Sequence, residues 1–174
     1  MPVLKTSRLI LRKITLRDAE DIFEYAKNPA VSRFTLWSPH RKLSDSVKFV
    51  KYITSNYRKG VEENWGIVHK TDGKLIGTIG FFNWDEANNK AEIHYALSNQ
   101  YSGLGLMTEA VKEALEFGFH KMRLHRIEAR CMVKNLASEK VMRKSGMKFE
   151  GIMRSGLFVK GRYVDLKTYA VIKS

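Results

Sequence analysis

The feature that most constrains the fold of this chain is a glycine-containing loop between a strand and a helix. Residues 90–98 are typical of a strand, and residues 106–122 carry apolar side chains at helical spacing. The apolar positions of that helix are Met107, Ala110, Val111, Ala114, Leu115 and Gly118. Between the two segments, Gly103 and Gly105 allow positive φ. This strand and helix belong to a β-α-β-α stretch that follows antiparallel hairpins, and that order of elements favours a mixed α/β sheet.

The remaining segments predict strands and helices in a mixed order. Further strands are expected at residues 8–14, 65–70, 75–82 and 126–133, and two more meet at residues 160–161. Further helices are expected at residues 15–27, from residue 44 or 45 to 59, and at 136–145, with Asn28-Pro29 breaking the first. We expect an α/β (α+β) fold, a single domain over residues 1–174, because no linker or repeat divides the chain.

The composition excludes several classes of protein. The 31 Lys and Arg against 18 Asp and Glu give a net charge of +13, which favours anionic partners. No apolar run approaches the ~20 residues of a membrane-spanning helix, and the N-terminus lacks the apolar stretch of a secretory signal. Cys131 is the only cysteine, and the histidines lack metal-ligand spacing. We therefore expect a cytoplasmic protein without a metal or a membrane contact.

The loop at residues 100–105 has the composition of an anion site. Its glycines leave no Cβ between backbone and ligand, and the first turn of the following helix presents unpaired N–H groups. A phosphate or pyrophosphate would fit there. The full Rossmann pattern and the Walker lysine are both missing, which argues against dinucleotides and nucleoside triphosphates. The alternative is that Gly103 and Gly105 only shape a turn.

This loop resembles the acyl-CoA signature of the GNAT acetyltransferase superfamily, Gln/Arg-x-x-Gly-x-Gly/Ala, as Gln100-x-x-Gly103-x-Gly105. Further segments are similar to the family in the same order: its central strand at residues 91–97, its next motif at 135–151, and the RimJ/RimL branch at 7–12 and 154–165. That branch contains ribosomal-protein N-terminal acetyltransferases. The resemblance implies a GNAT-like, mostly antiparallel sheet flanked by helices, with acetyl-CoA as co-substrate.

The resemblance also implies the residues that hold acetyl-CoA. They are Leu97, Ser98, Gln100, Ser102, Gly103, Leu104, Gly105, Leu106, Met107, Thr108, Asn135 and Ser138. Within this set, Asn135 is expected to hold the pantetheine arm. A backbone N–H near Leu97 and Ser98 is expected to stabilise the developing oxyanion.

Glu92 is the candidate general base, because relatives carry a carboxylate on this strand. The two-residue period places it on the same face as His94, which is a second candidate. The alternative for Glu92 is an ion pair with a neighbouring Lys or Arg. An α-amine, with a pKa of ~8, asks less of such a base than a Lys side chain at ~10.4.

Ser138 is the candidate group that bonds or protonates the leaving sulfur. Many family members place a Tyr seven residues after the motif Asn, but that position here is Met142. The alternative is that Asn135 is an ordinary N-cap, Ser138 a first-turn residue, and water the acid. We interpret Cys131 as a buried, inert thiol, so the amine would attack the thioester directly, without an acyl-enzyme.

The function expected from these features is acetyl transfer from acetyl-CoA to a primary amine, in particular a ribosomal-protein or peptide N-terminus. A small amine, amino acid, polyamine or antibiotic is an alternative acceptor, and a basic RNA-binding module with a vestigial acyl-CoA site is a more remote one. Ribosomal RNA, contacted through the basic surface, and a second copy of the chain in a homodimer are the further candidate partners. The aromatic residues at 34–37, Trp84 and Tyr163 either line the acceptor pocket or belong to the core.

Overall fold

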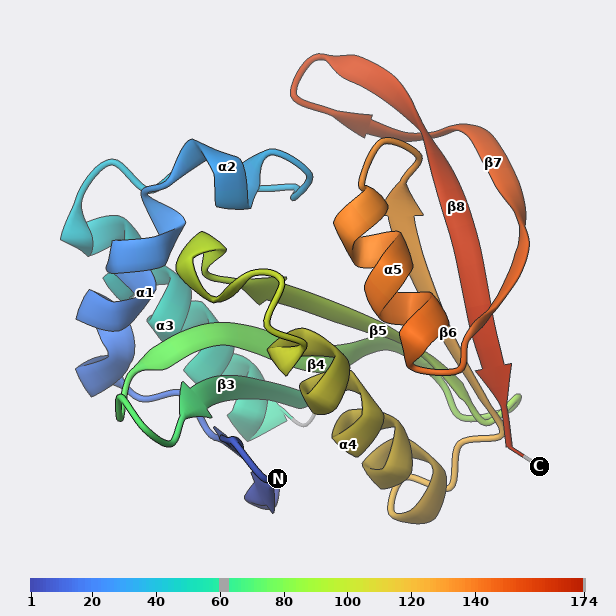
Figure 1. The fold of residues 1–174 in the computed structure, drawn as a ribbon, viewed down its shortest axis with the longest axis horizontal. Coiled ribbons are helices and arrows are strands. Elements are labelled where there is room, and N and C mark those ends of the chain that lie inside the picture. The colour runs from blue at the N-terminus through green and yellow to red at the C-terminus, as the bar shows by residue number, and fades with distance from the viewer. Residues whose placement is uncertain (60–62, 174) are drawn as a thin grey trace.

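The computed structural model describes residues 1–59 and 63–173, which form one sheet with helices on both faces (Figure 1). The strands are β1 (Leu4–Lys5), β2 (Leu9–Arg12), β3 (Glu63–His69), β4 (Leu75–Asp85), β5 (Lys90–Leu97), β6 (Arg126–Met132), β7 (Lys148–Val159) and β8 (Arg162–Ile172). The helices are α1 (Ala19–Ala26), α2 (Pro29–Ser32), α3 (Leu43–Lys59), α4 (Leu106–His120) and α5 (Leu136–Lys144), with short 3-10 turns η1 (Leu16–Asp18) and η2 (Asn99–Tyr101).

The order of the strands in the sheet is β1-β2-β3-β4-β5-β6-β8-β7. Within the described ranges, β5 and β6 are the parallel pair, and the other neighbours pair antiparallel. Two parallel neighbours need a long crossover, and α4 supplies it. The predicted single-domain fold, a mixed and mostly antiparallel sheet flanked by helices, is confirmed.

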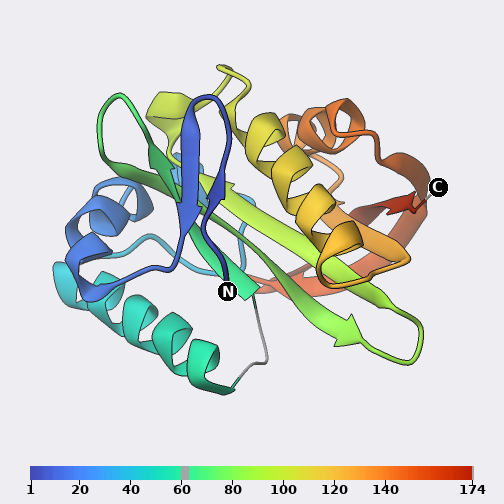
Figure 2. The same ribbon diagram turned by 90° about the horizontal axis from the view of Figure 1, so that it is seen from below.

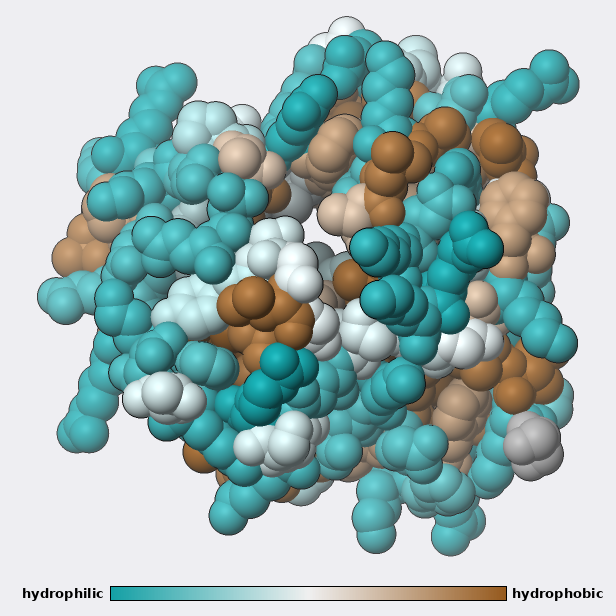
Figure 3. All heavy atoms as spheres, viewed as in Figure 1, coloured by the Kyte–Doolittle hydropathy of each residue, from teal (hydrophilic) through white to brown (hydrophobic). Residues whose placement is uncertain are grey.

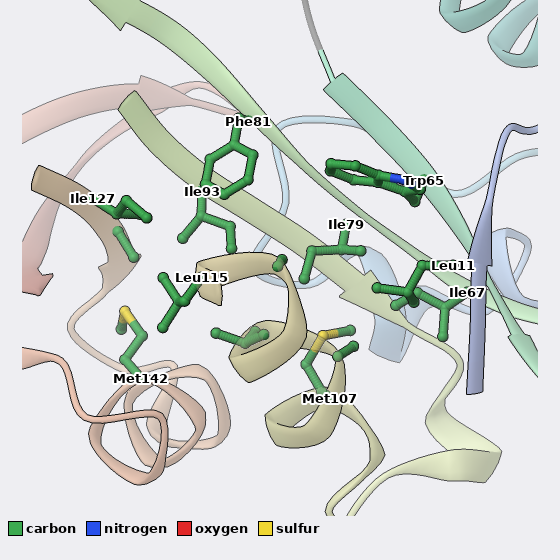
Figure 4. Close-up of a cluster of buried hydrophobic side chains, with 14 of the residues drawn as sticks. Leu11, Trp65, Ile67, Ile79, Phe81, Ile93, Met107, Leu115, Ile127 and Met142 are labelled. Carbon is green, nitrogen blue, oxygen red and sulfur yellow. The ribbon is translucent and has the colours of Figure 1, made fainter. Parts of the chain in front are cut away.

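The helices cover opposite faces of the sheet (Figure 2). On one face, α1 and α3 pack over β3 and β4 around Ile22, Val50 and Val68. On the other face, Met107 and Leu115 of α4 point toward the sheet, where Figure 4 shows them among the other buried apolar side chains. Burial of each such side chain stabilises the fold by about 1.5–3 kcal/mol. No helix in the described part of the chain is both long and apolar enough to cross a membrane.

The structure departs from the sequence prediction at two places near the N-terminus. The helix expected from residue 15 begins as η1, where the Asp18 carboxylate accepts from the Thr15 amide at 2.7 Å. The first helix ends before Asn28-Pro29, as expected, but the same two residues also begin the short helix α2, which the sequence did not predict. Asn28 caps it by accepting from the Ala30 amide at 2.9 Å, and a proline fits the first position of a helix because no N–H is needed there.

Candidate active site

The site is built around the place where β5 and β6 separate. Their parallel pairing runs from Lys90 and Arg126 to Glu92 and Glu128, whereas the strands themselves continue to Leu97 and Met132. In Figure 1, β5 continues toward η2 and β6 continues beside α5. Figure 3 shows the surface hollowed between the segment that leads into α4 and helix α5. A wedge-shaped opening therefore begins just beyond Glu92.

One wall of this opening is the glycine loop. Gly103 and Gly105 adopt φ values of 80° and 78°, in the left-handed region. A Cβ at Gly103 would meet nothing within 4 Å, so this glycine is required by its backbone conformation and not by space. The first amide of α4 that bonds back is that of Glu109, to the Gly105 carbonyl at 3.1 Å. The amides before it have no acceptor within the helix and can bind an anion.

The side chains of the loop and of the first turn face different ways. Gln100, Ser102, Gly103, Leu104 and Gly105 are exposed, and Thr108 is half-buried. Leu106 and Met107 are buried in the core, where Figure 4 labels Met107. Of the expected cofactor residues, Leu106 and Met107 can therefore offer a ligand only their backbone amides.

Residues at the β3–β4 turn contact the segment just before the glycine loop and hold Tyr101 in place. Tyr101 donates to the Asp72 carboxylate at 2.5 Å, and His69 Nδ1 lies 2.8 Å from the same carboxylate. The Tyr101 ring also packs edge-on against His69, with centroids 5.4 Å apart. The bond to Asp72 raises the pKa of Tyr101 to about 12. This contact was not expected from the sequence, because nothing in the local pattern of either segment indicates it.

Of the two amides expected to stabilise an oxyanion, that of Ser98 is already in use. It donates to the Ile76 carbonyl of β4 at 2.7 Å. Because successive amides of a strand point to opposite edges, the Leu97 amide points away from β4, toward the side from which β6 has diverged. The Leu97 amide is therefore the candidate donor, and Ser98 is not.

Glu92 lies at the apex of the opening and is nearly buried, with 9% of the residue exposed. Its carboxylate is 3.1 Å from the guanidinium of Arg130 on β6, so the ion pair considered as an alternative is present. Burial raises the pKa of Glu92 above its ordinary value, while Arg130 and a hydrogen bond from Asn83 oppose the rise. The raised pKa suits a proton acceptor. His94 follows on the same face and packs edge-on against Phe82, with centroids 5.2 Å apart.

Asn135 and Ser138 meet at the start of α5, on the other side of the opening. Asn135 is the N-cap, and its side chain accepts from the Ser138 amide at 3.1 Å. The Ser138 hydroxyl lies 2.9 Å from the hydroxyl of Tyr95, which reaches across from β5. Sequence reasoning missed this tyrosine as a site residue. The two-residue period assigns Tyr95 to the face opposite Glu92, but it does not reveal what it touches.

Two side chains that could take part in sulfur chemistry are inert. Burial raises the pKa of the Cys131 thiol to about 11, so almost none of it is thiolate at neutral pH. Met142 is fully buried in the core beside α4, as Figure 4 shows. The protonated Cys131 is a poor nucleophile, and the Met142 thioether has no proton to donate. In the described part of the chain, no group of three or more metal-ligating side chains gathers.

The aromatic residues considered for an acceptor pocket do not form one wall. Trp37 packs against the α1–α3 cluster, and Phe34 packs against a cluster of Met132, Val159 and Leu166. Trp84 and Tyr163 are 42% and 68% exposed. The Phe34 contact instead brings the segment after α2 against the β7–β8 hairpin. Lys160 of that hairpin also donates to the Ser32 carbonyl at 2.5 Å.

Comparison with known proteins identifies relatives in sequence and in fold. The model of the family described as "Acetyltransferase (GNAT) domain" matches residues 8–148. The Bacillus licheniformis chain named "Uncharacterized N-acetyltransferase p20" is 32% identical over 173 residues, covering 99% of this chain and 97% of its own. A solved GNAT-family acetyltransferase from Bacillus anthracis superimposes with a TM-score of 0.86 and 28% identity, covering 98% of each chain.

Two relatives have names that state an acceptor. The ribosomal-protein-serine acetyltransferase of Escherichia coli is 30% identical over 106 residues, which cover 61% of this chain and 59% of its own. The spermidine N(1)-acetyltransferase of Escherichia coli is 25% identical over 156 residues, which cover 88% of this chain and 80% of its own. The two names differ in the class of amine that is acetylated.

Proposed function

The chain belongs to the GNAT acetyltransferase family and is an acetyl-CoA-dependent N-acetyltransferase; we propose that its acceptor is the α-amine of a protein or peptide N-terminus. The observation that carries this proposal is the state of Glu92, a nearly buried carboxylate that is ion-paired with Arg130. At pH 7 roughly one tenth of an α-amine with a pKa of ~8 is neutral, against roughly one in 2,500 for a Lys side chain at ~10.4. A carboxylate is a weak base, so it is better suited to an α-amine, which is partly neutral already, than to a Lys side chain.

In the proposed reaction the amine attacks the thioester carbonyl carbon, and the carbon–sulfur bond then breaks. Glu92 takes the proton that the amine loses, directly or through one water. The Leu97 amide donates to the carbonyl oxygen as negative charge develops on it. The Ser138 hydroxyl, held 2.9 Å from Tyr95, donates a hydrogen bond to the departing sulfur; the thiolate takes its proton from water, and Glu92 returns the amine proton to water before the next turnover. The amides at the start of α4 hold the pyrophosphate, and Asn135 holds the pantetheine arm.

Two further observations support a ribosomal protein as the acceptor. A ribosomal-protein-serine acetyltransferase is among the relatives, although it matches only part of this chain. The net charge of +13 would draw the enzyme to an anionic assembly such as the ribosome, where contact with RNA would concentrate it near its substrate. The same charge disfavours a polyamine, because two strongly cationic partners repel one another.

A panel of acceptors tests the proposal. The purified enzyme is given acetyl-CoA with peptides that start with a free α-amine, the same peptides with blocked N-termini, spermidine and free amino acids, and CoA release is measured. We expect peptides with a free α-amine to be turned over at least about tenfold faster, by kcat/KM, than their blocked forms or the small amines. Faster turnover of spermidine would overturn the proposed acceptor while leaving acetyl transfer intact.

A further inference from the structure

The N-terminal segment contacts the glycine loop through Arg8, the residue just before β2. The Arg8 guanidinium donates from Nε to the Glu109 carboxylate at 2.7 Å, and its Nη2 lies 2.7 Å from the same oxygen. Its Nη1 donates to the Leu104 carbonyl at 3.0 Å. One side chain thus joins the loop to the first turn of α4.

Neighbours of Arg8 complete a full set of partners for Glu109. Its second oxygen accepts from the Thr6 hydroxyl at 2.6 Å, the Ser7 hydroxyl at 3.0 Å and the Arg8 amide at 2.9 Å. Although partial burial opposes it, these bonds lower the pKa of Glu109 to about 2. The carboxylate is therefore ionised at neutral pH and is held by three consecutive residues of the N-terminal segment.

A carboxylate at this position conflicts with the anion site of the proposed function. Glu109 lies in the first turn of α4, in the same turn whose amides are proposed to hold a pyrophosphate. A negative charge stabilises a helix N-terminus in an empty site, but it repels a phosphate a few ångströms away. The guanidinium of Arg8 is close enough to both groups to remove the conflict, since its Nη2 is 3.7 Å from the position that a Cβ on Gly105 would occupy.

We propose that Arg8 is a positioning residue of the acetyl-CoA site: it neutralises Glu109 and fixes the Leu104 carbonyl, so that the loop presents only donors to the pyrophosphate. The inference rests on the proposed function, because it takes the glycine loop to be the pyrophosphate site. It adds a residue some 90 positions away from the loop, in a segment that the loop motif does not include. Without Arg8, the Glu109 charge would be uncompensated beneath the ligand.

The test compares two acetyl donors in four proteins: the wild type, Arg8→Ala, Glu109→Gln and the variant that carries both substitutions. Acetyl-CoA carries the pyrophosphate, whereas S-acetylpantetheine carries the same thioester without it. For Arg8→Ala we expect the Kd and KM of acetyl-CoA to rise about tenfold, as for the loss of one interaction with a charged group, with kcat and the kcat/KM of S-acetylpantetheine unchanged. Adding Glu109→Gln to Arg8→Ala should restore most of the affinity, and Glu109→Gln alone should change Kd by less than about twofold.

A matched control is Arg12→Ala, four residues along. Arg12 pairs with Asp18, at 2.7 Å, and contacts no part of the loop. Arg12→Ala should lower the thermal stability, but any change in kcat/KM should be the same for acetyl-CoA and for S-acetylpantetheine. Equal effects of Arg8→Ala on both donors, or no recovery in the double variant, would overturn the inference. If the wild-type enzyme failed to bind acetyl-CoA, the proposed site itself would be wrong.

Discussion

The protonation of Glu92 is set by two opposing effects on one side chain. Burial at the apex of the β5–β6 opening raises its pKa, and the positive charge of Arg130 limits the rise. Glu128, which lies 3.9 Å from Arg130, acts in the same direction as burial. A base must be deprotonated to act, so activity should fall as the pH drops through the pKa of Glu92. The acidic limb of the rate profile thus reports on this balance.

Replacement of Arg130 by Gln should move that limb to higher pH. The substitution removes the charge that favours the ionised carboxylate, while the burial remains. We expect the acidic pKa in the kcat/KM profile to rise further above its wild-type position, with turnover near pH 9 little changed. Initial rates measured between about pH 5 and 9 at subsaturating acceptor, with the concentration of the neutral amine held constant so that titration of the amine itself drops out, give the profile.

Two variants control this experiment. Arg126→Gln removes a cation from the same face of β6, but Arg126 binds Glu128 and Glu150 and does not contact Glu92. Arg126→Gln should therefore leave the acidic limb of the kcat/KM profile at the wild-type pH. Glu92→Gln should lower kcat/KM by about a hundredfold, as expected for loss of a general base, and abolish the limb. A profile that is the same in Glu92→Gln as in the wild type would remove Glu92 from the base role.

At the scale of secondary structure, local patterns predicted most elements, but not the contacts between them. The period of two along β5 assigned its faces, and the apolar spacing in α4 located its buried stripe, since both depend only on neighbouring residues. The contacts of Tyr95 with Ser138 and of Arg8 with Glu109 span 43 and 101 positions. A single sequence carries no signal for such pairs. Likewise, the occupied amide of Ser98 depends on its register with β4.

The close approach of β4 to β5 gives a prediction at this scale. A Cβ on Gly77 would lie 2.3 Å from the Ala96 carbonyl oxygen and 3.1 Å from the Leu97 Cα, both of them backbone atoms. Backbone cannot rotate away as a side chain can, so Gly77→Ala must separate the strands. We expect the free energy of unfolding, measured by urea denaturation, to be about 1–3 kcal/mol lower than in the wild type, as for other overpacked sites. Activity should fall as well, because Leu97 lines the opening.

Gly151 in β7 provides a matched substitution. Its conformation is not left-handed, and a Cβ there would meet no atom within 4 Å. Gly151→Ala should therefore leave stability unchanged or raise it by about 0.4–1 kcal/mol, because it restricts the unfolded chain. If both variants were equally destabilised, the loss would reflect strand glycines in general and not the close contact at Gly77.

At the scale of the whole molecule, the excess of positive charge dominates long-range electrostatics. Individual pairs such as Arg12–Asp18 and Lys167–Glu139 are short, at 2.7 and 2.6 Å, and partly buried. They compensate charges locally, yet the chain as a whole keeps +13. Such an excess favours anionic ligands, and it also destabilises the compact state through self-repulsion. The contact with RNA and the homodimer stay predictions.

Added salt should therefore stabilise the folded protein. Between about 20 and 200 mM NaCl the Debye length falls from about 20 to 7 Å, which screens repulsion across the molecule more than attraction within a pair of groups in contact. Exposed ion pairs contribute at most about 1 kcal/mol each, so their partial loss is the smaller effect. We expect the Tm at pH 7 to rise by about 2–4 °C, the equivalent of roughly 1 kcal/mol for a chain of this size, measured by calorimetry in NaCl and KCl. At pH 9.9, the isoelectric point of the sequence, the rise should vanish. A Tm that falls with salt at pH 7 would mean that the paired charges outweigh the net excess.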